Sequence, residues 1–192
     1  MTITRRHALA ALAAVTATAA TLPGLPALAA DAATIDARVK VALGKLWNQE
    51  PGARDLAARS RGMLVMPEVV KGGFIVGGAY GEGALRLTDS VQGYEKNEEY
   101  YSVGAASVGF QIGVQSTSHV LFFMTDDALA KFRSADGWEI GADAEVTFPE
   151  KGVNAGIDST SYEKPVIGVV FAEDGLLFGV SLEGAKYSRI NR

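Results

Sequence analysis

The stretch from residue 30 to residue 62 carries apolar residues at helical spacing. Over 35–47 they recur at intervals of three and four, which is the pattern of one face of a helix. Thr34 is the expected N-cap, and Pro51 is expected to end this helix. A second, short helix is predicted over 53–61. The pattern therefore predicts that helices precede the rest of the domain.

After Gly62 the apolar pattern changes to the alternation that is typical of strands. The period of two is clearest over 101–115, where large apolar residues alternate with small or polar ones. Thr125 or Asp126 is expected to cap one inserted helix, and the Glu-Asp-Gly run at 173–175 is expected to form a hairpin turn. Strands are predicted over 62–67, 72–87 (as one bent strand or two), 101–115, 119–124, 142–148, 153–158, 166–172 and 176–187.

These elements predict an α+β fold. We expect N-terminal helices packed on a curled, mostly antiparallel β-sheet or partial barrel with one inserted helix. The 22 glycines and 6 prolines suit a β-rich fold with tight turns. Because 48% of the residues are hydrophobic, the chain can bury a core without disulfide bonds.

Residues 1–29 have the features of an export signal. Arg5 and Arg6 precede an apolar stretch, and Ala27-Leu28-Ala29 fits the small-x-small pattern of a cleavage site. The apolar stretch is too short and too weakly hydrophobic for a transmembrane helix. The arginine pair also resembles a twin-arginine signal, while the general secretory route stays open. We therefore expect residues 1–29 to be removed, and residues 30–192 to form one domain that is periplasmic or secreted from a bacterium, free or peripheral on a membrane.

Composition excludes several kinds of chemistry. There is no cysteine, which excludes disulfides, thiol nucleophiles and thiolate zinc sites. We expect no metal and no cofactor. Removal of the leader takes away two arginines and no acid, so 16 Lys+Arg face 22 Asp+Glu and the net charge is −6. A domain this acidic is not expected to bind nucleic acid.

Within this acidic chain, the segment 35–61 is locally basic. The first predicted helix combines cations with Trp47 at one end, a pattern suited to lying on a membrane interface. Three cations over an anionic surface contribute about 1 kcal/mol each, enough for reversible contact. The alternative interpretation is that the apolar face packs on the sheet and the cations are solvated, and the two are partly compatible. The candidate lipid-binding residues are Arg38, Lys40, Lys45, Trp47, Arg54, Arg59 and Arg61.

Two other constellations are weaker. Ser107, Gln111 and Gln115 share one face of the predicted strand 101–115, where they either line a groove or form a second core layer, and we favour the core layer. His119 lies close in sequence to two serines, but no Gly-x-Ser-x-Gly elbow accompanies it. A lone histidine before an apolar strand is more often a strand-end residue. We therefore expect no enzyme and no catalytic residue.

Several blocks of the sequence resemble the SYLF domain family. They are Gly72-Gly73-Phe74 with the glycine-rich strand that follows, the stretch 101–113, and the stretch 175–184. The resemblance is ordered along residues 35–190. It implies a lipid-binding domain, since eukaryotic relatives are associated with phosphoinositide membranes and cortical actin, and bacterial ones with the cell envelope. Phosphoinositide binding in those relatives is attributed to a basic amphipathic segment at the place that 35–61 occupies here. The eukaryotic Trp-Ser-x-Pro run is replaced by Tyr-Ser-Val-Gly at 101–104.

The expected function is a secreted, non-enzymatic domain that contacts anionic phospholipid or phosphoinositide-type headgroups through the basic segment. The alternative is a structural or interaction protein of the envelope that binds a protein or a hydrophobic ligand. The net charge of −6 favours this alternative, because it opposes general adsorption to anionic bilayers.

Overall fold

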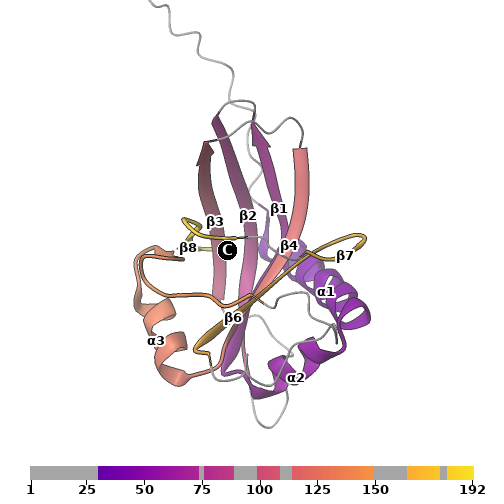
Figure 1. Cartoon of the computed structure of the whole chain (residues 1–192), viewed down its shortest axis with the longest axis vertical. Coiled ribbons are helices and arrows are strands. Elements are labelled where there is room, and N and C mark those ends of the chain that lie inside the picture. The colour runs from indigo at the N-terminus through magenta and orange to yellow at the C-terminus, as the bar shows by residue number, and fades with distance from the viewer. Residues whose placement is uncertain (1–29, 74–75, 89–98, 109–113, 149–163, 178–180) are drawn as a thin grey trace, which may run out of the picture.

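The computed structural model describes residues 30–73, 76–88, 99–108, 114–148, 164–177 and 181–192. The expected export signal and the predicted strand 153–158 lie outside these residues. Within them, three helices accompany one curled, half-barrel sheet, which confirms the predicted α+β class with helices N-terminal to the sheet (Figure 1). The helices are α1 (Ala32–Gln49), α2 (Gly52–Arg59) and α3 (Asp126–Ser134).

Eight strands of the described residues form a single antiparallel sheet. Their order is β5-β8-β3-β2-β1-β4-β6-β7. The long strands β1 to β4 occupy the centre and project beyond the helices (Figure 1). The bounds are β1 (Gly62–Gly73), β2 (Val76–Leu87), β3 (Glu99–Val108), β4 (Val114–Phe123), β5 (Trp138–Glu139), β6 (Val166–Ala172), β7 (Gly175–Leu176) and β8 (Lys186–Ile190).

Both faces of the sheet are buried where the helices cover it. Successive residues of a strand point to opposite faces, so Val65 and Val120 join the core under α1 and α2, while Leu64 joins the core under α3. The second core is built around Phe132 of α3, whose ring lies 4.7 Å from that of Tyr101 and 4.8 Å from that of Phe123 between centroids. Each face therefore has its own hydrophobic cluster, and the sheet separates them.

Strand β1 contains a bulge that the sequence pattern does not reveal. The prediction that Pro67 ends this strand was wrong, because β1 continues to Gly73. The register with β2 shifts between Val65 and Val69, so the proline lies where the ladder needs no N–H. At Gly83 of β2, a Cβ atom would lie 2.0 Å from the carbonyl oxygen of Val65, so only glycine lets the two strands approach here.

Other boundaries differ from the predictions for similar reasons. The predicted strand 101–115 was wrong as one element, because it contains most of β3 and the start of β4, with 109–113 outside the described residues. The predicted strand 176–187 was wrong as one element, because it runs from the last residue of β7 to the start of β8, and 142–148 makes only isolated bridges. The N-cap of α1 is Asp31, whose carboxylate accepts a hydrogen bond from the amide of Thr34 at 2.7 Å.

Elements defined by short-range signals were predicted correctly. Strand β6 has the predicted bounds 166–172. The hairpin turn at 173–175 joins β6 to β7, with Gly175 at φ +132°. Thr125 caps α3 by accepting a hydrogen bond from the amide of Ala128 at 3.2 Å.

Candidate functional site

Helix α1 lies across one face of the sheet and is tied to it at both ends. Its buried face packs on the sheet through Ile35, Val39, Ala42, Leu43 and Leu46. Near its start, the hydroxyl of Tyr100 on β3 donates to the carboxylate of Asp36 at 2.9 Å. At its end, the side-chain amide of Gln49 donates to the carbonyl of Ala172 on β6 at 3.1 Å. These contacts fix which flank of α1 faces the strands.

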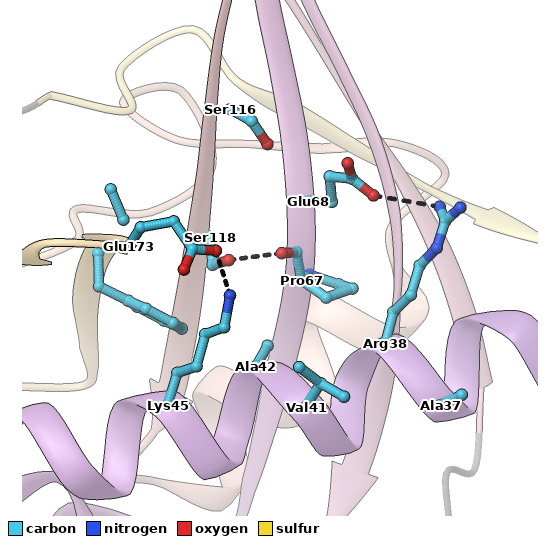
Figure 2. A pocket seen from close by; sticks show the side chains of 12 residues that line it. Ala37, Arg38, Val41, Ala42, Lys45, Pro67, Glu68, Ser116, Ser118 and Glu173 are labelled. Atoms are coloured by element: carbon cyan, nitrogen blue, oxygen red, sulfur yellow. Dashed lines mark hydrogen bonds and ion pairs between the residues drawn. The ribbon is translucent and has the colours of Figure 1, made fainter.

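An open hollow of about 390 Å³ lies between α1 and strands β1, β4 and β6 (Figure 2). On the helix side, Arg38 and Lys45 point up from α1 toward the strands, with Val41 between them. The strand side contributes Ser116 and Ser118 of β4. The hollow therefore combines two cations, two hydroxyls and an exposed apolar side chain.

Each cation of the hollow is paired with a solvent-accessible carboxylate. Arg38 lies 3.4 Å from Glu68, with side chains 52% and 49% exposed. Lys45 contacts Glu173 of the hairpin turn, and that carboxylate is 81% exposed. Ion pairs this accessible to water contribute about 0–1 kcal/mol. Separating either ion pair therefore costs little free energy.

The apolar member of the hollow is Val41, whose side chain is 60% exposed. It follows Arg38 by three residues and precedes Lys45 by four, so all three lie on one flank of α1. We call Arg38, Val41 and Lys45 the cationic row. All three side chains of the cationic row are exposed to solvent, although the neighbouring Ala42 and Leu46 are buried.

The structure does not bring the seven predicted residues to one surface. At about 100° per residue, Lys40 and Trp47 fall on the flank of α1 opposite the cationic row. Arg54 of α2 stacks over the Trp47 ring, 5.4 Å from its centroid. Arg59 and Arg61 line a separate hollow of about 470 Å³ near the start of α3. The basic segment is thus divided into three groups.

Sequence reasoning missed the contribution of the strands. Glu68, Ser116 and Ser118 come from β1 and β4, and the local charge pattern of 35–61 contains no signal for them. Alternation along β4 places both serines on the face of Val120, which packs under α1. That signal was present in the sequence but needed the correct start of β4.

The histidine and serines considered for catalysis lie on opposite faces of β4. His119 is 1% exposed, and its Nε2 lies 2.8 Å from the hydroxyl of Tyr187 in the core under α3. Burial lowers the pKa of His119 to about 3. Ser118 instead donates to the carbonyl of Pro67 on the other face. Of the proposed strand face, Gln111 and the side chain of Ser107 lie outside what the structure describes.

In the part of the chain that the structure describes, no helix is both long and apolar enough to cross a membrane. A comparison with curated proteins finds no match. A family model described as "Ysc84: Las17-binding protein actin regulator" matches residues 104–191. The matched stretch contains the strand side of the hollow at Ser116, Ser118 and Glu173, while α1 precedes it. This match agrees with the resemblance of the sequence to the SYLF domain family.

Proposed function

We propose that this domain is a non-enzymatic lipid-binding module that contacts anionic phospholipid headgroups through the cationic row above the hollow. The observation that carries the proposal is the exposure of Val41 between two cations. Packing of α1 on the sheet does not use Val41, whereas an apolar side chain between cations suits a membrane interface. The family is associated with lipid and actin binding, which supports a lipid as the partner.

The chemistry of the hollow suits a phosphate group. The planar guanidinium of Arg38 donates two parallel hydrogen bonds to phosphate oxygens, and Lys45 adds a second positive charge. The hydroxyl of Ser116 stands on the opposite wall as a further donor. Because Glu68 and Glu173 hold the cations only weakly, phosphate competes with them. Val41 then meets the acyl boundary beside the headgroup.

The experiment is co-sedimentation of residues 30–192 with vesicles of phosphatidylcholine alone or mixed with phosphatidylglycerol or a phosphoinositide. The test variant is Arg38→Glu with Lys45→Glu. The matched control is Lys40→Glu with Arg54→Glu, which makes the same change of charge away from the cationic row, on the other flank of α1 and on α2. We expect at least a roughly 30-fold weaker affinity for the test variant, because two attractions of about 1 kcal/mol each are lost.

The control variant is expected to bind anionic vesicles nearly as well as the unaltered domain. Equal loss in both variants would assign binding to the whole basic segment rather than to the cationic row. Unchanged binding of the test variant would remove the proposed surface. Circular dichroism and thermal unfolding of each variant establish that the fold is intact. Binding should also weaken as salt rises, because the contact is electrostatic.

We also propose that the protein acts outside the cytoplasm of a bacterium, on the strength of the leader-like residues 1–29. Replacement of Arg5 and Arg6 by lysine is expected to block export if the twin-arginine route is used. Export by the general secretory route would survive this change. Cell fractionation distinguishes the two routes, and a protein that stays in the cytoplasm in its unaltered form would contradict the proposal.

The alternative role, binding an envelope protein, is supported by a different observation. Val70 of β1 and Tyr80 of β2 are opposite each other in the ladder and are 42% and 52% exposed. An exposed apolar pair on a sheet fits a protein partner. Val70→Ser with Tyr80→Ser is expected to abolish capture of such a partner while vesicle binding persists. Loss of vesicle binding instead would assign the pair to the lipid surface.

A further inference from the structure

Glu82 of β2 is a buried carboxylate that holds the first residue of the described domain. Its side chain is 7% exposed. One oxygen accepts a hydrogen bond from the backbone nitrogen of Ala30 at 3.0 Å. The other accepts from the hydroxyl of Tyr80 at 2.8 Å and is also contacted by the guanidinium of Arg192. Ala30 and Arg192, which follows β8, therefore meet at one carboxylate.

The residue that Glu82 contacts is the one that leader removal would expose. The small-x-small run at 27–29 places the cleaved bond between Ala29 and Ala30. Hydrolysis by the export peptidase adds one water, leaving a carboxylate on Ala29 and an α-ammonium on Ala30. The nitrogen that donates one neutral hydrogen bond in the precursor thereby gains a positive charge and two further donors.

We propose that Glu82 is the receptor for the N-terminus made by leader removal, and that processing converts the Ala30–Glu82 hydrogen bond into an ion pair. The two observations are independent, since one comes from the cleavage pattern and the other from the contact. Charge-assisted hydrogen bonds are roughly twice as strong as neutral ones. Processing therefore strengthens a contact that the fold has already positioned.

The surroundings of Glu82 are suited to a second cation. Burial on its own would raise the pKa of the Glu82 carboxyl, but the hydrogen bonds from Tyr80, Arg192 and Ala30 outweigh it and hold the pKa below its ordinary value. The carboxyl is thus ionised at neutral pH.

The ion pair bears on α1, because the helix begins two residues after Ala30 and Asp31 is its N-cap. Anchoring the terminus on β2 fixes the start of the helix against the sheet. The mature domain should therefore hold α1 more firmly than the precursor does. This inference does not depend on lipid binding, and the two can fail separately.

The test compares four proteins: residues 30–192 and residues 29–192, each with Glu82 or with Glu82→Gln. The extra Ala29 moves the charge away from the carboxylate. We expect it to lower the melting temperature by about 2–4 °C in the Glu82 background and to leave the Glu82→Gln background unchanged. An equal shift in both backgrounds, or none in either, would overturn the proposal.

Two further measurements keep the proposal testable if the glutamine variant does not fold. The pKa of the Ala30 α-ammonium in residues 30–192, followed by NMR, is expected above the range of an unpaired terminus. An ordinary value would overturn the ion pair. Mass spectrometry of the exported protein, made from the full chain in a bacterial host, is expected to find Ala30 as its first residue. A different first residue would overturn the assignment of the cleaved bond.

Discussion

Acidification provides a direct test of the burial of His119. This histidine is 1% exposed on β4, its Nε2 bonds to the hydroxyl of Tyr187, and its Nδ1 finds no hydrogen-bond partner among the described residues. Burial lowers its pKa from 6.5 to about 3 in the folded domain. Below about pH 6.5 the unfolded chain therefore binds a proton at His119, whereas His119 of the folded domain stays neutral.

The size of the effect follows from this difference. Because the folded pKa is depressed, stability is fully present above the unfolded pKa and is lost as the pH falls. The free energy of unfolding falls by roughly 1.4 kcal/mol per pH unit below that point, which gives about 2 kcal/mol between pH 6.5 and pH 5. Glu82 and Glu99 also have lowered pKa values, but their ordinary value of 4.5 places their effect mostly below this window.

The assay is urea unfolding of residues 30–192 at several values between about pH 7 and pH 5. His119 is the sole histidine of this stretch, so His119→Gln should remove the slope even if it lowers stability at every pH. A free energy of unfolding that stays constant over this range in the unaltered domain would refute the reasoning. A slope that persists in the glutamine variant would assign it to another group.

Two further predictions concern packing, and both are checked by urea or thermal unfolding. Gly83→Ala should lower the free energy of unfolding by about 2–3 kcal/mol, because its Cβ would lie 2.0 Å from a backbone oxygen. The control Gly104→Ala, whose Cβ would meet nothing within 4 Å, should change it by less than about 0.5 kcal/mol. Phe132→Ala should cost about 3–5 kcal/mol, because the ring fills the core under α3. If Phe132→Ala lowered the free energy of unfolding no more than Val41→Ala at an exposed position does, this description of the core would be contradicted.

The parts of the fold that the sequence predicted correctly depend on neighbours in the chain. The helical period of α1, the cap at Thr125 and the hairpin at 173–175 are each set by a few consecutive residues. Propensity, capping and turn chemistry act over that distance. Strand β6 was found because its apolar run is short and is bounded by turn residues on the C-terminal side.

The errors arose where distant partners decide the structure. The stretch 101–115 contains no proline, asparagine or aspartate to mark a turn, so the alternation alone did not separate β3 from β4. Pro67 is accommodated because β1 bulges at this point, where its register shifts against both β2 and β4. The candidate site was incomplete for the same reason, since Glu68 and Glu173 reach the cationic row only through the pairing of β1, β4 and β6.

The outer edge of β6 affects whether two copies of the protein can pair edge to edge. The sheet ends there in a strand of two residues, β7. Backbone groups on this edge of β6 already have partners. The amide of Gly168 donates to the carbonyl of Thr147 at 2.9 Å, and the carbonyl of Val170 accepts from the amide of Leu177 at 2.8 Å. A strand from another molecule would have to displace both segments before it could pair. The covering of this edge therefore protects a strongly apolar strand from edge-to-edge aggregation.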